Sequence, residues 1–247
     1  MMNILTKTYN FILLPGLDGT GDAYFWLKKC MLASGVQLEN INVITYEDEY
    51  SYEALNLRVK NIITNSILPI FIIAESFAGP LALALASENP DKVKKLVLSA
   101  TFGVKPVCKF IHPLGLSLFN IFPKSLVPVN KIPSIFLHEL LLGKYATSGI
   151  KLTMENIFFN SKQNIFDKRI KSVVSLPSQW DKQWKNIINT DALIIQPSKD
   201  RLLNKINAQI LKENLPKSFL IELEAPHLLL QTHAGEAWEH IVKFEKI

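Results

Sequence analysis

The hydrophobic pattern of the chain alternates between two periods. Six short runs are rich in β-branched and aliphatic residues and are bounded by glycine, proline or acidic residues; they cover residues 11–14, 42–46, 69–74, 95–99, 192–196 and 219–223. Helical spacing of apolar residues separates them, near residues 23–34, 55–67, 80–87, 206–211 and 237–242. Nearly all-apolar strands that alternate with amphipathic helices indicate right-handed βαβ crossovers. The pattern predicts an α/β fold with a mostly parallel open sheet flanked by helices.

One segment interrupts this alternation. From about residue 104 to residue 185 the sequence has no convincing strand, prolines divide it into short pieces, and it holds seven of the 14 phenylalanines. It is too long for a loop and too apolar for a linker. We therefore expect a core domain formed by residues 1–103 and 186–247, with a helical lid (cap) inserted over residues 104–185. The phenylalanines are expected to form the lid's own core, and an apolar roof favours an acyl chain over a sugar or a peptide.

Charge adds a second feature to this segment. The whole chain carries 27 Lys and Arg against 22 Asp and Glu, and a net charge of +5 is too small to indicate nucleic-acid binding. Residues 104–185, however, hold twelve Lys and Arg against four Asp and Glu, so the segment is +8 and the remainder is −3. Such a cluster is most often a solvated face. The alternative is an acidic docking partner, such as acyl carrier protein, or an anionic membrane surface.

Cysteine content and hydropathy exclude several other classes of protein. Cys30 and Cys108 are too few for a disulfide scaffold, and neither has a second cysteine or a histidine at metal-ligand spacing. We expect neither a metal nor an organic cofactor. No apolar run approaches the roughly 18 residues of a membrane span, and no signal segment is recognisable. The sequence predicts a cytoplasmic protein without a transmembrane segment.

Three predicted strand ends carry side chains typical of nucleophilic catalysis. Ser76 lies on a sharp strand-to-helix turn, and Asp200 and His227 follow the last two strands. Working groups in open α/β sheets gather beyond the carboxyl ends of the strands, so one imidazole can bridge the hydroxyl and the carboxylate. A serine is inert until a base takes its proton, and the base needs a carboxylate to fix its tautomer. We therefore predict Ser76 as nucleophile, His227 as base and Asp200 as acid.

A glycine-rich loop after the first strand, residues 14–21, completes the predicted site. Its position predicts the N–H groups of Leu17 and Phe77 as oxyanion donors, and its glycines let the backbone approach the oxyanion closely. The loop lacks the Gly-Lys-Ser/Thr and Gly-x-Gly-x-x-Gly spacings of phosphate-binding loops. The remaining histidines are weaker candidates for the base, since His233 and His240 lie on the last helix and His112 and His138 lie in the insertion. Among the acidic residues, Asp191 lies at the opposite end of its strand and Asp18 is expected to fix the conformation of the loop. No role is assigned to Glu75.

Taken together, these motifs resemble those of the α/β-hydrolases over the whole chain. The strongest stretches are LLPGLDGTG at residues 13–21, AESFAGPL at residues 74–81 and PHLLLQ at residues 226–231. The chain is similar to the small lidded serine esterases of that family, which include the pimeloyl-acyl-carrier-protein methyl ester esterase. The resemblance implies the same triad and oxyanion donors. Two features depart from the family pattern: Pro15 stands where many members have histidine, and Ala74 and Ala78 replace the outer glycines of Gly-x-Ser-x-Gly.

The expected function is hydrolysis of a carboxylic ester or thioester with an apolar acyl group, through an acyl-serine intermediate. A serine on the turn argues against dehalogenase and epoxide hydrolase chemistry, in which an aspartate attacks. Three alternatives stay open: a carrier-protein-dependent methyl ester esterase of biotin synthesis, an acyltransferase, and a non-catalytic binding protein on the same fold.

Overall fold

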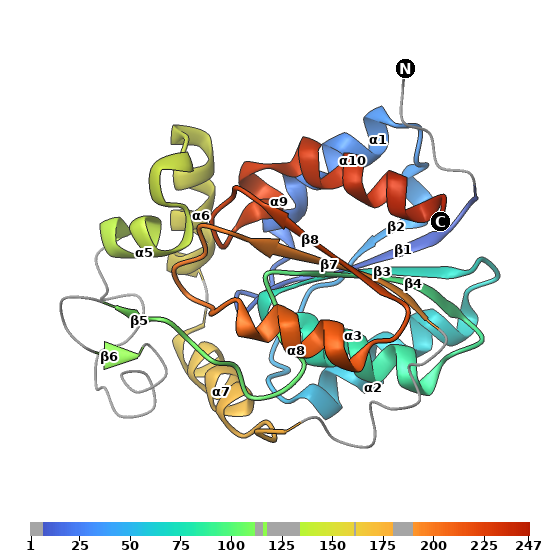
Figure 1. Ribbon diagram of the computed structural model, residues 1–247, viewed down its shortest axis with the longest axis horizontal. Helices are drawn as coiled ribbons and strands as arrows, with labels where there is room; N and C mark the ends of the chain where they lie inside the picture. The colour runs from blue at the N-terminus through green and yellow to red at the C-terminus, as the bar shows by residue number, and fades with distance from the viewer. Residues whose placement is uncertain (1–6, 112–115, 118–133, 161, 180–189) are drawn as a thin grey trace.

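Six parallel strands form one open sheet in a computed structural model that describes residues 7–111, 116–117, 134–160, 162–179 and 190–247 (Figure 1). The strand order is β2-β1-β3-β4-β7-β8. The strands are β1 (Asn10–Leu14), β2 (Ile41–Val43), β3 (Ile70–Glu75), β4 (Val93–Ser99), β7 (Asp191–Pro197) and β8 (Ser218–Leu223). All six predicted strands are therefore present, and the expected α/β class is confirmed. The second is shorter than expected because residues 44–46 leave the sheet after Val43.

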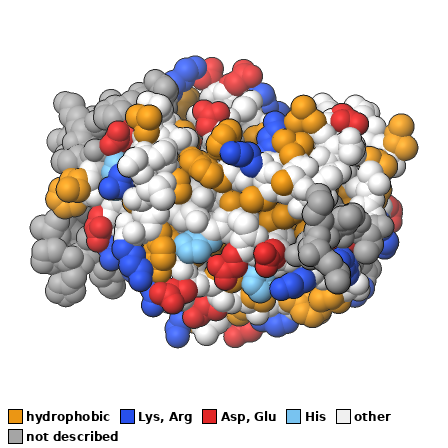
Figure 2. Space-filling model, turned by 90° about the horizontal axis from the view of Figure 1, so that it is seen from above, with side chains coloured by type: hydrophobic (Ala, Val, Ile, Leu, Met, Phe, Trp, Pro, Cys, Tyr) orange, Lys and Arg blue, Asp and Glu red, His pale blue; other side chains and the backbone are white. Residues whose placement is uncertain are grey.

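Helices cover both faces of this sheet. One face carries α1 (Phe25–Ala33), α9 (Leu229–Thr232) and α10 (Ala234–Glu245), and the other carries α2 (Tyr52–Asn65), α3 (Gly79–Glu88) and α8 (Ile206–Asn214), as Figure 1 shows. Short 3₁₀ turns, η1 (Asp22–Tyr24), η2 (Leu38–Asn40) and η3 (Ser76–Ala78), join some of the elements. Among the described helices none is long and apolar enough to span a bilayer. Seen from the α1 and α10 side, charged and apolar side chains are interspersed over the surface (Figure 2).

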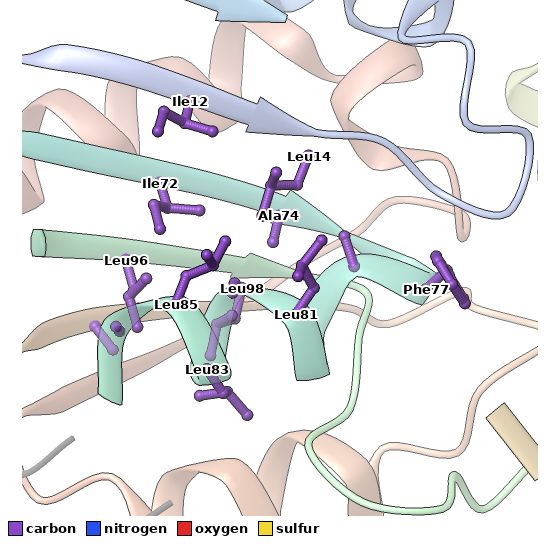
Figure 3. Packing of buried hydrophobic residues seen from close by; sticks show 14 of the residues in the cluster. Ile12, Leu14, Ile72, Ala74, Phe77, Leu81, Leu83, Leu85, Leu96 and Leu98 are labelled. Carbon is purple, nitrogen blue, oxygen red and sulfur yellow. The ribbon is translucent and has the colours of Figure 1, made fainter. Parts of the chain in front are cut away.

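The central strands are buried on both faces, as their composition predicted. Figure 3 shows side chains of β1, β3 and β4, among them Ile12, Ile72 and Leu98, directed toward Leu81 and Leu85 of α3. All of these side chains are inaccessible to solvent. Burial of each large aliphatic side chain contributes roughly 1.5–3 kcal/mol to folding, so this contact fixes α3, and with it the turn that precedes α3. The edge strand β8 differs, since Phe219 and Leu220 are exposed.

The strand order places a topological switch point at the carboxyl ends of β1 and β3. From β1 the chain passes through α1 to β2 on one side, and then through α2 to β3 on the other side of β1. The two connections diverge at this point, which is where open α/β sheets generally form their ligand-binding crevice. The glycine-rich loop and Ser76 therefore lie at the position where open α/β sheets bind their ligands.

The described elements of the segment that joins β4 to β7 lie at the same end of the molecule (Figure 1). Its described elements are β5 (Phe110–Ile111), β6 (Leu116–Ser117), α5 (Ser134–Leu141), η5 (Gly143–Tyr145), α6 (Ser148–Asn160) and α7 (Gln163–Val174). The expectation of no strand in residues 104–185 was wrong, because β5 and β6 pair antiparallel, although two-residue strands are too short to leave a periodic signal. The parts of the predicted lid at residues 112–115, 118–133, 161 and 180–185 lie outside the described residues.

The described helices of this segment pack on loops of the core. Ile150, Met154 and Ile157 of α6 form an apolar cluster with Ala23 and Leu228. On α7, Phe166 and Ile170 form a second cluster, against which Leu17 of the glycine-rich loop packs. The described apolar side chains of the segment therefore pack on the loops around the switch point. Of the phenylalanines expected to form the lid's own core, Phe166 is buried but Phe136 is exposed.

Candidate active site

Ser76 occupies a strained backbone position between β3 and η3. Its φ angle is +52°, in the left-handed region that non-glycine residues rarely adopt. Such a conformation costs of order 1–3 kcal/mol and persists where the surrounding structure enforces it. The flanking Ala74 and Ala78 are fully buried, so a methyl group fits at both positions where the motif usually has glycine.

Contacts from neighbouring elements enforce this turn. The hydroxyl of Thr101 donates a hydrogen bond to the Ser76 carbonyl, and the hydroxyl of Tyr52 donates to the Phe77 carbonyl at 3.0 Å. Gly79 begins α3 with no room for a side chain, because a Cβ there would lie within 3.0 Å of Thr101 Oγ1 and of the Phe102 carbonyl. The close packing thus requires glycine at position 79, one residue beyond the position that the motif prescribes.

The three residues predicted from separate strand ends form one hydrogen-bonded line. His227 Nε2 lies 2.9 Å from Ser76 Oγ, and His227 Nδ1 lies 2.8 Å from Asp200 Oδ2. The other carboxylate oxygen, Asp200 Oδ1, accepts hydrogen bonds from the N–H groups of Leu202 at 2.7 Å and Leu203 at 2.9 Å. His227 and Asp200 are almost fully buried, whereas Ser76 is partly exposed. The hydroxyl of a partly exposed serine is therefore connected to a buried imidazole and a buried carboxylate.

Two opposing effects set the pKa of His227. Burial by itself lowers it, because the charged imidazolium loses its hydration. The Asp200 carboxylate, through its charge and its hydrogen bond, and to a smaller extent the charge of Glu75 together outweigh burial and raise the pKa of His227 above its ordinary value. This imidazole therefore accepts a proton more readily than an isolated buried histidine, which suits a base.

The loop after β1 lies against Ser76. A Cβ placed on Gly16 would come 3.9 Å from Ser76 Cβ, so the backbone of Gly16 passes beside the serine. Asp18 Oδ2 accepts hydrogen bonds from the N–H and the hydroxyl of Thr20 at 2.9 and 2.7 Å, the loop-fixing contacts expected of this residue. Leu17 lies on this loop, and on the other side of the turn the buried Phe77 ring stacks on Tyr52 at 4.9 Å.

A buried carboxyl beside the serine was not given a role from the sequence. Glu75 Oε2 accepts a hydrogen bond from Gln231 Nε2 at 2.8 Å. Glu75 Oε1 and Gln231 Oε1 are both buried, and neither has a hydrogen-bond partner in the described structure. Burial is the main cause that raises the pKa of Glu75 to about 7. The sequence could not predict the contact between Glu75 and Gln231, because the two residues lie 156 positions apart.

The other candidates lie apart from the hydrogen-bonded line. Asp191 pairs with Lys95 at 3.0 Å, at the amino ends of β4 and β7. His138 lies 3.6 Å from Glu155, and His233 hydrogen-bonds the neighbouring Thr232. His112 lies outside the described residues. Within the described part of the chain, no three His, Cys, Asp or Glu side chains gather as a metal site requires.

Comparison with known proteins agrees with this architecture. No protein-family model matches the chain. Over 186 residues it is 24% identical to the 2-hydroxymuconate semialdehyde hydrolase of Pseudomonas putida, an alignment that covers 71% of this chain and 59% of that protein. The chain thus spans less than two thirds of the length of this curated relative.

Solved structures match over nearly the whole chain. The enol-lactonase of Burkholderia xenovorans superposes with a TM-score of 0.77 at 12% identity, covering 98% of this chain and 92% of its own. An esterase of Exiguobacterium antarcticum gives 0.71 at 16% identity, with 99% and 94% covered, and a hydrolase of Oleispira antarctica gives 0.71 at 16%, with 97% and 93% covered. With its six-stranded parallel sheet and these neighbours, the chain has the α/β-hydrolase fold.

Proposed function

We propose that the protein is a serine hydrolase that cleaves a carboxylic ester or thioester through an acyl-Ser76 intermediate. The observation that carries this proposal is the line from Asp200 through His227 to Ser76, with distances of 2.8 and 2.9 Å, ending at a serine on a strained turn. A buried imidazole held between a carboxylate and an accessible hydroxyl has the geometry that nucleophilic catalysis by serine requires. The esterase and lactonase among the structural neighbours support the same class of reaction.

In the proposed reaction Ser76 Oγ attacks the carbonyl carbon of the substrate while His227 Nε2 takes its proton. Asp200, fixed by two backbone N–H groups, holds His227 Nδ1–H and stabilises the imidazolium. When the tetrahedral intermediate collapses, His227 gives the proton to the leaving alcohol or thiol, and acyl-Ser76 remains. A water molecule, deprotonated by His227, then attacks the acyl group and releases the acid.

The backbone N–H groups of Leu17 and Phe77 are proposed to bind the oxyanion. Leu17 lies on the loop whose backbone passes beside Ser76, and Phe77 follows the serine on the turn. Donors that are fixed before the reaction stabilise the developing charge without reorganisation, and loss of one such donor costs roughly 3 kcal/mol of transition-state stabilisation.

The segment between β4 and β7 is proposed to act as the lid. Its helices α6 and α7 pack on core loops next to the site, and their apolar side chains suit an apolar acyl group. Its charge of +8 favours an anionic partner over a neutral one, either an acyl carrier protein or an anionic surface.

The proposal predicts covalent labelling by a fluorophosphonate probe. Wild-type protein should form a phosphonyl adduct on Ser76, and Ser76→Ala should form none. Ser99→Ala is a matched control, because the Ser99 hydroxyl is buried at the end of β4 without a hydrogen-bond partner in the described structure. Intact-mass spectrometry and peptide mapping measure the adduct and its site.

Hydrolysis of p-nitrophenyl esters completes this test. Acetate, butyrate and octanoate esters, together with a lactone, should be hydrolysed by the wild type and by Ser99→Ala, with an initial burst where deacylation is slow. Ser76→Ala should lose the activity. Labelling that survives this substitution, or a folded wild type that neither reacts with the probe nor hydrolyses any ester, would favour a binding protein on a hydrolase fold.

A further inference from the structure

A buried cation from the inserted segment reaches the glycine-rich loop. Arg169 lies on α7 and is 3% exposed. Its guanidinium donates hydrogen bonds to four backbone carbonyls: Nη1 to Leu17 and Asp18, both at 2.9 Å, Nη2 to Tyr46 at 3.0 Å, and Nε to Glu49 at 3.0 Å. It also lies over the Tyr46 ring, 5.4 Å from the centroid. One side chain thus joins α7, the loop after β1 and the loop after β2.

The contacts of Gly19 connect this guanidinium to the backbone beside Ser76. Gly19 has a φ of +71°, and a Cβ there would lie within 3.0 Å of the Arg169 guanidinium, so the two groups are in close contact. The Gly19 carbonyl accepts from the N–H of Tyr46 at 2.7 Å, and its N–H donates to the Gly16 carbonyl at 3.2 Å. Gly19 is therefore held from both sides.

The hydrogen bond from the Gly19 N–H to the Gly16 carbonyl fixes the direction of the Leu17 N–H. The Gly16 carbonyl and the Leu17 N–H belong to the same planar trans peptide and point in opposite directions. When the Gly16 carbonyl is turned toward Gly19, the Leu17 N–H must point away from the interior of the loop. On the other side of Leu17, Arg169 holds the Leu17 carbonyl. Both peptides that flank Leu17 are therefore restrained.

We infer that Arg169 is a positioning residue for the oxyanion site: it holds the loop so that the Leu17 N–H is ready before the substrate binds. The inference rests on the proposed esterase function. Arginine suits the role because its planar guanidinium offers five donors, whereas lysine offers one flexible ammonium group. Asp18, Glu49 and Asp48 lie near enough to stabilise the buried positive charge, which would otherwise be costly.

Substitution of Arg169 tests the inference against a merely structural role. Arg169→Met keeps most of the apolar stem of the side chain without its donors, and Arg169→Lys keeps the charge in case the methionine variant fails to fold. The control is Lys162→Gln. Lys162 precedes α7 and forms an exposed ion pair with Asp48 at 2.7 Å, and this ion pair does not involve the loop after β1. Both Arg169 variants should lower kcat for p-nitrophenyl butyrate by about 100-fold, the cost of a misplaced catalytic group, with KM nearly unchanged.

Two further measurements separate oxyanion binding from general damage. The inhibition constant of an alkyl trifluoromethyl ketone, which forms a tetrahedral oxyanion adduct with serine, should rise in parallel with the loss in kcat. The acid limb of the pH–rate profile, which reports His227, should not move. A folded Arg169→Met with wild-type kcat and inhibition constant would overturn the inference. So would a shifted acid limb, or an equal loss in Lys162→Gln.

Hydrogen exchange provides a readout that does not need activity. Amides of residues 16–19 should exchange faster in either Arg169 variant than in the wild type, while those of β3 stay protected. If the wild type hydrolyses no ester and is not labelled by the fluorophosphonate, the proposed function fails, and the exchange data still decide whether Arg169 holds the loop. Unchanged exchange in both variants would contradict the restraint itself.

Discussion

At the scale of single residues, the protonation state of Glu75 is decided by the fold. Its carboxyl is buried next to Ser76, and burial raises its pKa to about 7. The carboxyl and the Gln231 amide share one hydrogen bond, and each keeps one buried oxygen without a donor. A buried oxygen that lacks a donor disfavours the ionised carboxylate, which has lost its hydration. The folded state is therefore more stable when the Glu75 carboxyl is neutral than when it is ionised.

This pair predicts a pH-dependent stability difference. The ordinary pKa of Glu75 is 4.5 and its folded value is about 7, so its stabilising contribution is present below pH 4.5 and is lost as the pH rises through 7. Glu75→Gln cannot ionise. We expect it to unfold at higher urea than the wild type at pH 8, by a free energy of up to about 3 kcal/mol, and to match the wild type near pH 4.5.

Urea titrations of both proteins at the two pH values measure the effect. Glu222→Gln, on the exposed edge of β8, is the control, and its stability should match that of the wild type at both pH values. A stability difference between wild type and Glu75→Gln that is equal at both pH values would exclude ionisation of Glu75 as its cause.

At the scale of elements, the unit formed by β3, η3 and α3 sets the position of the serine. The residues of β3 are apolar and buried up to Ala74, and α3 packs on the sheet through Leu81 and Leu85. Since both elements are fixed, the three residues of η3 must bridge them, and Ser76 takes up the strain. Motif spacing located this turn in the sequence, but the contact that makes it tight, between Gly79 and the segment after β4, involves residues far apart in the chain.

Gly79→Ala tests this contact. Its methyl group would meet Thr101 Oγ1 and the Phe102 carbonyl within 3.0 Å, and overpacking of this kind costs typically 1–3 kcal/mol. We expect a loss of about 2 kcal/mol in the free energy of unfolding together with a lower kcat, because Ser76 must shift. Thermal unfolding and p-nitrophenyl ester assays measure both effects.

Gly235→Ala is the matched substitution. Gly235 lies in α10 with no atom within 4 Å of an added Cβ, so alanine should be neutral or stabilising there by up to about 1 kcal/mol. If Gly79→Ala proved as stable and as active as Gly235→Ala, the tight approach of α3 to the segment after β4 would not be what fixes the serine.

At the scale of the whole molecule, the charge distribution bears on what approaches the site. The inserted segment is +8 and the rest of the chain −3. Its exposed lysines include Lys151 and Lys171, whose side chains form no ion pair with any described residue. Such a field attracts anions over distances comparable to the Debye length of about 10 Å at 0.1 M salt. The field raises the rate at which an anionic substrate meets the protein, and it does not change the rate of the bond-breaking step.

We therefore expect salt to distinguish anionic from neutral esters. Between 10 and 300 mM NaCl, kcat/KM for a hemiester of a dicarboxylic acid should fall by about tenfold, whereas a neutral ester of the same length should change little. Lys151→Gln combined with Lys171→Gln should weaken this dependence. Lys29→Gln combined with Lys243→Gln, on the exposed sides of α1 and α10, removes the same charge elsewhere and should not. Equal salt dependence for both esters would exclude steering by the inserted segment.

The sequence by itself determined the α/β class, the six strands and the positions of Ser76, Asp200 and His227. These follow from local information: apolar runs that can be stable only when buried on both faces, and polar residues placed directly after such runs. It missed β5 and β6, since two-residue strands have no period, and parts of the predicted lid lie outside the described residues.

The tertiary structure alone decided the contacts that join distant parts of the chain. It brought Arg169 of the inserted segment onto the carbonyls of Leu17 and Asp18, about 150 positions away, and paired Glu75 with Gln231. Such contacts depend on the distance and direction between elements, which come from packing and have no local sequence pattern. The sequence therefore specified which side chains lie at the strand ends. The packing of the whole chain specified their hydrogen-bond partners and their protonation states.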